Sequence, residues 1–263
     1  MIGMGFRREM HDWDMSALQA DFVEVVPENW LRRDRDLLHA LQSLGKPVRL
    51  HGVSLNLGGT SAIEPTFLRS VRALMDELQT PFYSDHLAAS GDAHQLYDLF
   101  PVECSPAEVL RVSDRIRQAQ DILGCRMAVE NTTWYTNRSS MPEAAFISAV
   151  IERADCHLLL DLNNVVVNHK NHGMEPLDAF VAQLDLARVS YLHVAGHEFD
   201  PRFDMFIDTH SRPIEAQTAQ MARKLQQTHG LDVLLEWDND VPMPDVFNQE
   251  IACLRRSSSM CAA

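Results

Sequence analysis

The chain has 263 residues, 46% of them hydrophobic, and no apolar run near the ~20 residues of a membrane span, which indicates a globular protein. Its 23 basic and 37 acidic residues give a formal net charge of −14, and a surface of that sign repels nucleic acid. The N-terminus has no signal-peptide pattern and the five cysteines are scattered without a CxxC pair, which favours a reducing, cytoplasmic location.

Strand and helix patterns alternate eight times along the chain. The strand patterns are mostly continuous apolar runs, as expected for parallel strands buried on both faces. They lie at Ile2–Phe6, Asp21–Val26, Val48–His51, Phe82–His86, Met127–Glu130, His157–Asp161, Val189–Val194 and Val233–Glu236. Helical patterns follow at Trp13–Gln19, Leu31–Leu44, Pro65–Leu78, Pro106–Leu123, Pro142–Arg153, Pro176–Leu184, Ile214–Thr228 and Pro244–Arg256.

This alternation predicts a single (β/α)8 TIM barrel, an α/β fold, over residues 1–256, with a frayed tail at residues 257–263. An open doubly wound sheet is the structural alternative. It would place residues from successive strand ends in a line, where they could not converge on one site.

Metal-ligand residue types recur at the ends of six predicted strands. They are His51, His86, Glu130, Asp161, His193 and Glu236, at intervals of 35, 44, 31, 32 and 43 residues. One strand-plus-helix unit of a barrel takes about 30 residues, so all six are expected at the C-terminal rim, where barrels carry their chemistry. A lone strand-end histidine is commonly structural, but six in register predict a metal site. Histidine and carboxylate suit iron, manganese or zinc.

Three further segments of the predicted rim carry candidate residues. Ala88–Ser105 and Ala195–Pro213 are long loops suited to substrate recognition. The second loop holds Asp208 and His210, which an extended backbone would aim to one face. Asn163–Gly173 is expected to be a loop in which Asn164 could add an oxygen ligand. The residues leave open whether His169, His172 and His197 are ligands or ordinary histidines.

The motifs LHG, SDHLA, VENT, LLLDLNN, VNHKNHG, HVAGH, DTH and EWDNDVP follow in this order over nearly the whole chain. Together they resemble the multinuclear non-heme iron-dependent oxidative enzymes, most closely the methanobactin biosynthesis branch. The resemblance implies a xylose-isomerase-like TIM barrel related to the metal-dependent apurinic endonucleases. It implies a ligand set of His51, His86, Glu130, Asp161, Asn164, His193, Asp208, His210 and Glu236. Asn164 stands where the nucleases have histidine, which argues against a hydrolytic zinc site.

The resemblance further implies two to three iron ions and O2 as co-substrate. The substrate would be cysteine in a ribosomally made precursor peptide, converted to oxazolone and thioamide in the methanobactin branch. A partner protein of the MbnC type would form a heterodimer with the chain and present the precursor.

From the residues themselves, Asp238 follows Glu236 by two positions and is the candidate catalytic base, with a solvated loop acid as the alternative. Four other functions stay open for the chain. They are another cysteine-modifying branch, a divalent-metal sugar isomerase or epimerase, a nuclease, and an iron-holding scaffold without enzyme activity.

Overall fold

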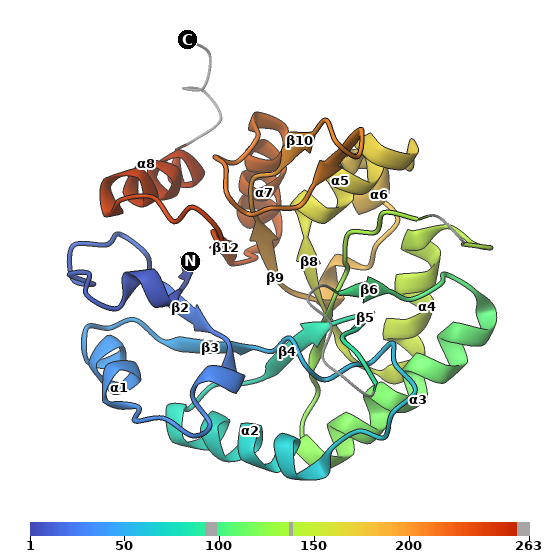
Figure 1. Cartoon of the computed structure of the whole chain (residues 1–263), viewed down its shortest axis with the longest axis horizontal. Helices are drawn as coiled ribbons and strands as arrows, with labels where there is room; N and C mark the ends of the chain where they lie inside the picture. Colours follow the sequence, from blue (N-terminus) through green and yellow to red (C-terminus); the bar gives the residue numbers. More distant parts are fainter. Residues whose placement is uncertain (93–98, 137–138, 257–263) are drawn as a thin grey trace.

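The computed structural model describes residues 1–92, 99–136 and 139–256. Eight parallel strands close into a barrel in the order β1-β2-β3-β4-β7-β8-β9-β12, and helices surround it (Figure 1). The strands are Ile2–Gly5 (β1), Phe22–Val25 (β2), Val48–His51 (β3), Tyr83–His86 (β4), Ala128–Glu130 (β7), His157–Asp161 (β8), Val189–Val194 (β9) and Val233–Leu235 (β12). The predicted barrel is therefore confirmed, with every strand close to its expected bounds. The predicted tail lies outside the described residues.

Helices cover the outside of the barrel, and most lie where the sequence predicts them. They are Asp36–Ser43 (α1), Pro65–Leu78 (α2), Pro106–Leu123 (α3), Glu143–Ala154 (α4), Leu162–His172 (α5), Leu177–Val181 (α6), Ala216–His229 (α7) and Pro244–Arg255 (α8). Short 3-10 turns lie at Arg8–Met10, Pro27–Asn29 and Leu186–Arg188. Helix α3 shows why the bounds were predictable: the Ser105 side chain accepts from the Glu108 N–H, and Gly124 ends the helix in the left-handed region.

Local hydrogen bonds explain why one predicted helix is absent and two others are shorter than predicted. The predicted helix Trp13–Gln19 is wrong: the Asp14 carboxylate accepts from both the N–H and the hydroxyl of Ser16, which favours a turn. The helix predicted from Leu31 begins only at Asp36, whose N–H donates to the Asp34 carboxylate. The helix predicted to reach Leu184 ends at Val181, where i-to-i+3 bonds close the last turn.

The segment Asn163–Gly173, predicted as a loop, is helical from its start to His172 and forms most of helix α5. Asp161 caps its start by accepting from the Asn164 N–H, and Gly173 ends it with φ of +64°. Asparagine and valine have low helix propensity, so the local sequence argues against this helix. Burial of Val165, Val166 and Val167 against the core outweighs that preference.

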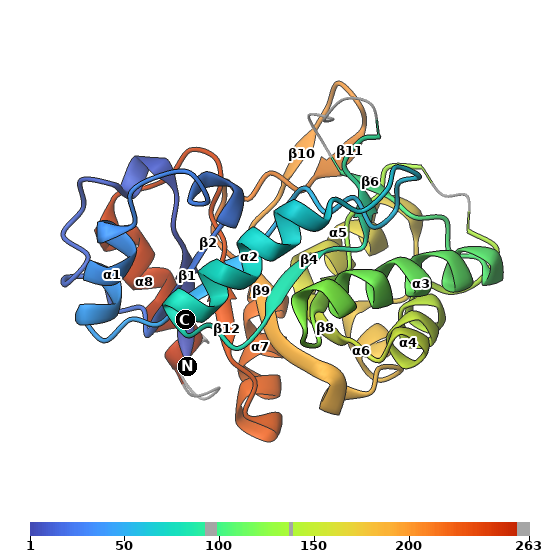
Figure 2. The same ribbon diagram turned by 90° about the horizontal axis from the view of Figure 1, so that it is seen from below.

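Both predicted rim loops contain short antiparallel strand pairs. Ala88–Ala89 (β5) pairs with Phe100–Pro101 (β6), and Glu198–Asp200 (β10) pairs with Met205–Ile207 (β11). Figure 2 shows β10 and β11 standing out beyond the end of the barrel. Among the described residues, no helix combines the length and hydrophobicity that crossing a bilayer requires.

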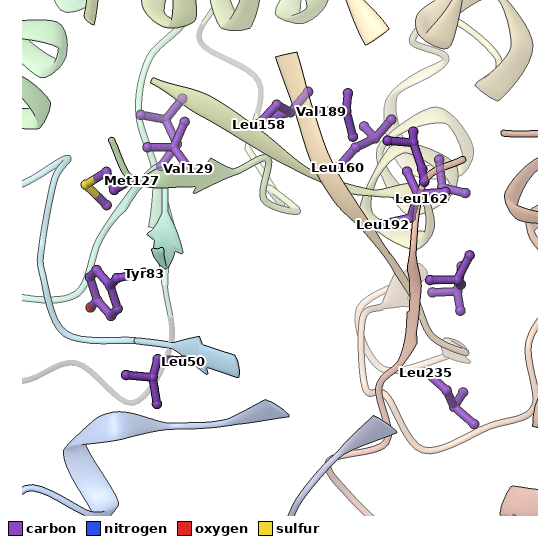
Figure 3. Packing of buried hydrophobic residues seen from close by; sticks show 14 of the residues in the cluster. Leu50, Tyr83, Met127, Val129, Leu158, Leu160, Leu162, Val189, Leu192 and Leu235 are labelled. Carbon is purple, nitrogen blue, oxygen red and sulfur yellow. The ribbon is translucent and has the colours of Figure 1, made fainter. Parts of the chain in front are cut away.

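Side chains of the barrel strands alternate between two environments. Those facing outward, such as Leu50, Tyr83, Val129 and Leu160, pack in the main hydrophobic core (Figure 3). Those facing inward form two layers. The lower, which we call the apolar layer, consists of Phe22, Ala128, Leu159, Tyr191 and Leu234. Two residues further along the strands lies the polar layer, which consists of Glu24, His51, His86, Glu130, Asp161, His193 and Glu236.

Candidate metal centre

Three groups of ligand-type side chains converge at the C-terminal end of the barrel. They are His51, His86 and Glu130; then Glu130, Asp161, His193 and Glu236; then His210, Glu236 and Asp238. Within each group the candidate ligand atoms lie within 4.8 Å of one another. Glu130 joins the first group to the second, and Glu236 joins the second to the third. Because a carboxylate has two oxygens, each of them can bridge two cations.

The first group presents two histidine nitrogens to one carboxylate oxygen. The Nε2 atoms of His51 and His86 lie 2.9 and 3.3 Å from Glu130 Oε2. His86 Nδ1 lies 3.0 Å from the Gly52 carbonyl oxygen, which can only accept a hydrogen bond. His86 Nδ1 therefore carries a hydrogen, and Nε2 is the nitrogen that would face a cation.

The second group is centred on His193, which is fully buried at the end of β9. Its Nδ1 lies 3.3 Å from Glu130 Oε1 and 3.1 Å from Glu236 Oε2. Its Nε2 faces Glu24 instead, at 3.2 Å. Asp161 reaches the same group from the end of β8, where Asn131 bonds to its backbone N–H and carbonyl.

The third group depends on a turn after β11. His210 has φ of +47°, in the left-handed region, so the segment from Asp208 to His210 is not the extended one predicted. The turn still brings His210 Nε2 to 2.9 Å from Asp208 Oδ1. His210 Nδ1 lies 3.2 Å from Asp238 Oδ2 and 3.5 Å from Glu236 Oε2.

Two predicted ligands lie beside these groups rather than within them. Asp208 accepts from Asn163 Nδ2 at 2.6 Å and faces His210, and Asn164 donates through Nδ2 to the Asn131 carbonyl. Both line the same cavity as the three groups. The Asn164 Oδ1 atom is buried without a hydrogen-bond partner, so its oxygen is free to face a cation.

Unpaired buried atoms indicate that this donor set fits a cation. The atoms that are buried and lack a hydrogen bond of acceptable geometry include Glu130 Oε2, Asp161 Oδ2, Asn164 Oδ1, His193 Nδ1 and His210 Nε2. Leaving one such atom unpaired costs roughly 1–3 kcal/mol. A few cations would satisfy all of them together. The donors are imidazole nitrogen and carboxylate or amide oxygen, the set that suits divalent iron, manganese or zinc.

The charges point the same way. Burial, followed by the charges of Glu130 and Asp208, raises the pKa of Asp161 well above its usual range. Burial lowers the pKa of His86, but Glu130 and Asp85 outweigh it and raise that pKa to about 9. Burial alone would raise the pKa of Glu130. The positive charges of His193, His86 and His51 outweigh burial and hold the Glu130 pKa below its usual range. A bound cation would neutralise these crowded carboxylates in place of protons.

A cavity of about 300 Å³ opens over the three groups. Its remaining lining includes Thr132, Thr133, Tyr135 and Ile207. Arg7 reaches it from the end of β1, where it pairs with Glu236 at 2.8 Å and with Asp238. The Asp238 side chain is 35% exposed, so it lies at the mouth of the cavity and not at its floor.

The three histidines left open by the sequence lie outside the groups found among the described residues. His197 is held between Asn163 and Lys170, at 2.7 and 2.8 Å. His172 donates through Nε2 to the Trp134 carbonyl and stacks on the Trp134 ring, and His169 donates through Nδ1 to the Met174 carbonyl. Both ring nitrogens of His197, and one ring nitrogen each of His172 and His169, are engaged in these contacts.

Sequence reasoning missed Glu24 and Arg7, both of which contact the predicted ligands directly. The signal for Glu24 was present, because it is a lone charge within the apolar run FVEVV of a predicted strand. Its register matches that of the other inward residues of the polar layer. Arg7 follows a strand without any pattern that distinguishes it from a surface arginine.

Comparisons with known proteins agree with the motifs. The family model described as RiPP precursor modification enzyme MbnB/TglH/ChrH matches residues 1–259, where RiPP denotes a ribosomally made and later modified peptide. A UPF0276 protein of Acinetobacter baylyi is 38% identical over 248 residues, covering 92% of this chain and 85% of the relative. A UPF0276 protein of Shewanella oneidensis is 37% identical over 269 residues, covering 98% and 96%.

Solved structures share the fold at low identity. The 3-keto-D-glucoside 4-epimerase YcjR of E. coli has a TM-score of 0.63 and 13% identity, over 97% of this chain and 98% of that one. A xylose isomerase domain containing protein of Salmonella typhimurium has a TM-score of 0.62 and 13% identity, over 95% and 94%. These similarities confirm the xylose-isomerase-like barrel. The extent of the family match shows that the chain belongs to the MbnB/TglH/ChrH family of RiPP precursor modification enzymes.

Proposed function

We propose that this enzyme is a multinuclear iron-dependent oxidase that uses O2 to modify cysteine residues of a ribosomally made precursor peptide. One observation carries the proposal: three adjoining histidine and carboxylate groups, joined through Glu130 and Glu236, lie beneath one cavity. A mononuclear site needs no such bridging carboxylates. Formation of oxazolone and thioamide, as in methanobactin biosynthesis, is the reaction we propose first, with other cysteine oxidations of the family next.

The chain's own donors would hold the iron. His51, His86 and Glu130 would form the first position, and Asp161 and Asn164 would add oxygen to the second beside His193. His210 and Glu236 would serve the third, together with Asp208, which lies 2.9 Å from His210. Bound iron would supply one-electron exchange with O2 and Lewis acidity toward a thiol. None of the three groups contains cysteine. The substrate's thiolate would therefore bring the soft ligand that iron binds strongly.

Asp238 is the proposed proton acceptor. Burial raises its pKa, but Arg7 outweighs that effect and lowers it, so the carboxylate is ionised at neutral pH. It lies at the cavity mouth, where a substrate amide or β-carbon would lie once the thiol faces the polar layer. Arg7 holds Asp238 and Glu236 together, so one cation orients both the acceptor and a bridging ligand.

The rim supports a substrate larger than free cysteine. Phe100 on β6, Phe199 on β10 and Phe203 between β10 and β11 are exposed at 54%, 48% and 65%. Exposed aromatic side chains of this kind, here on the strand pairs of the two rim loops, are typical of a surface that contacts another chain. We propose that a partner protein of the MbnC type delivers the precursor here.

The test begins with anaerobically purified protein. Elemental analysis is expected to give about two to three iron ions per chain, in line with the three ligand groups. Zinc alone at one ion per chain would contradict the proposal. The iron protein is then given O2 and a precursor peptide, with and without the partner protein, and the products are weighed by mass spectrometry.

Matched peptides make the reaction test specific. A peptide with serine in place of each cysteine should keep its mass and consume no O2. Free cysteine should be turned over far more slowly than the peptide. Equal rates on free cysteine and on the delivered peptide would argue against a peptide substrate.

A further inference from the structure

Glu24 is a buried carboxylate in the polar layer that the proposed ligand set does not use. It lies on β2 with 1% of its surface exposed. Its partners are two residues of β9: the Tyr191 hydroxyl, which donates to Glu24 Oε2, and His193 Nε2, which lies 3.2 Å from Oε1 and 3.3 Å from Oε2. A carboxylate accepts hydrogen bonds and has no hydrogen to give.

The contact with His193 decides which of its nitrogens is free. Because Glu24 can only accept, His193 Nε2 must carry the hydrogen. The other nitrogen, Nδ1, faces Glu130 and Glu236 at 3.3 and 3.1 Å, and it is the nitrogen that would give up its hydrogen to a cation bound there. This is the arrangement in which a carboxylate behind a histidine fixes its tautomer and ring orientation for a metal.

A second contact carries the same constraint to His51 through two hydroxyl groups. The Tyr191 hydrogen is committed to Glu24, so the Tyr191 oxygen can only accept from Ser84 Oγ, 3.2 Å away. The single Ser84 hydrogen has three acceptors within reach: the Tyr191 oxygen, the Leu50 carbonyl at 3.4 Å and His51 Nδ1 at 2.9 Å. When Ser84 donates to the Tyr191 oxygen, which has no hydrogen left to offer, His51 Nδ1 must be the donor in its contact with Ser84. His51 Nε2, 2.9 Å from Glu130 Oε2, is then the nitrogen left to face a cation in the first ligand group.

We propose that Glu24 is the positioning residue that fixes the ligating tautomers of both His193 and His51. The inference rests on the proposed metal centre. It explains why one carboxylate is linked, directly or through hydroxyl groups, to two histidines that belong to two different groups. It also gives roles to Tyr191 and Ser84, whose hydroxyl groups lie inside an otherwise apolar part of the barrel.

Glu24→Gln is the decisive variant, because a glutamine has one oxygen and one NH2 group. Whichever way the amide turns, either His193 or Tyr191 faces a donor. Facing His193, the NH2 group would favour the wrong tautomer there. If the NH2 group faces Tyr191, it would reverse the direction of the hydrogen bonds, so that Tyr191 donates to Ser84 and Ser84 donates to His51 Nδ1. We expect affinity for Fe2+, measured anaerobically against a competing chelator, to fall about 10- to 100-fold.

A spectroscopic readout separates positioning from simple support of the fold. In Zn2+-loaded protein with 15N-labelled histidine, wild type should show hydrogens on His193 Nε2 and His51 Nδ1. Glu24→Gln should lose or shift upfield at least one of these signals. Tyr191→Phe should keep the His193 signal and change that of His51, since it interrupts only the path through Ser84. Glu143→Gln, a buried substitution of the same kind outside the polar layer, should match wild type.

The outcomes divide cleanly. If wild type binds metal and Glu24→Gln binds it equally well with both signals unchanged, the inference is wrong and the metal centre stands. If wild type binds neither Fe2+ nor Zn2+, the proposed metal centre itself fails. Should Glu24→Gln not fold, Tyr191→Phe decides, and an unchanged His51 signal in that variant overturns the inference.

Discussion

The two inward layers of this barrel come from the same strands yet have opposite characters. Leu159 and Asp161 lie two residues apart on β8, and Leu234 and Glu236 lie two apart at the end of β12. The apolar layer fills its space with side chains, and Gly3 lacks a Cβ where the Phe22 ring would collide with one at 2.3 Å. The polar layer instead retains buried atoms without hydrogen bonds. The close packing of the apolar layer stabilises the fold, and the unpaired ligand atoms of the polar layer form the candidate metal site.

The lower end of the barrel is also closed by charge. The Arg49 guanidinium lies 3.8 Å from the centre of the Phe22 ring and 4.8 Å from that of Tyr191, and it pairs with Asp232. Ring contacts of this kind stabilise by about 0.5–2 kcal/mol. We therefore expect substitutions in the polar layer to change metal binding and substitutions in the apolar layer to change stability.

The largest effect is expected from Glu130→Gln. Glu130 faces His51, His86 and His193, so it joins two of the three groups. An amide provides one weaker oxygen and cannot bridge two cations. We expect loss of the metal from both groups and no detectable turnover, measured by iron analysis and peptide oxidation. Full iron content in this variant would contradict a bridging role.

His210→Ala should produce a smaller, selective loss. His210 contributes only to the third group, through contacts with Asp238 and Glu236. We expect one iron ion fewer per chain while the other two positions stay loaded, as counted by elemental analysis. Asp208→Ala should give the same result if Asp208 serves that position. Loss of all the iron would show that the three groups cannot be filled independently.

Asp238→Asn separates a proton acceptor from a ligand at the edge of the polar layer. If Asp238 accepts a proton, turnover should fall about 10²–10⁴-fold while iron content and peptide binding persist. The comparison is made by measuring iron and product in the same preparation. Iron that falls together with activity would instead make Asp238 a ligand of the third group, where its oxygen already lies 3.2 Å from His210 Nδ1.

In the apolar layer, Leu159→Ala should lower stability and leave the metal in place. Leu159 is fully buried, and truncation of such a leucine costs about 2–5 kcal/mol through lost burial and the cavity left behind. Urea unfolding of the metal-free protein measures the cost, and iron analysis of the folded variant checks the site. Iron loss at full folding would show that the layers are coupled.

The strand ends were predictable from sequence because the evidence is local. A buried strand is an apolar run, and His193 or Glu236 following one is visible without knowledge of the fold. The roles of Glu24 and Ser84 were not predictable in this way. They depend on which strands lie across the barrel from each other, and the contact between Glu24 and His193 spans 169 residues of sequence.

The predictions for the α5 segment and for the segment around Trp13 were wrong for opposite reasons. In α5 the local preference of Asn163 and the valines argues against a helix, and burial overrides it. Around Trp13 the apolar spacing suggests a helix, but two hydrogen bonds from Ser16 to the Asp14 carboxylate favour a turn. In both places the deciding interaction is one that hydrophobic spacing does not report.

A buried carboxyl outside the barrel gives the last and smallest test of the comparison. Glu143 at the start of α4 is buried, but its oxygens face Trp134 Nε1 at 3.4 Å and Asn168 Nδ2 at 3.3 and 3.5 Å. Burial raises its pKa from 4.5 to about 7, and the hydrogen bonds from Trp134 and Asn168 oppose that rise only in part. Glu143 therefore avoids a buried negative charge by keeping its proton, whereas the carboxylates of the polar layer would be neutralised by a bound cation.

The sign of the pH dependence follows from that raised pKa. Between pH 4.5 and about 7 the folded chain keeps the Glu143 proton and the unfolded chain releases it, so stability falls as pH rises through this window. The total is about 3 kcal/mol, at about 1.4 kcal/mol per pH unit. Glu143→Gln should flatten this part of the curve in urea unfolding of metal-free protein. Subtracting the wild-type free energy of unfolding at each pH cancels the contribution of titrating groups in the polar layer. Parallel curves for the two proteins would show that Glu143 is ionised in the folded chain.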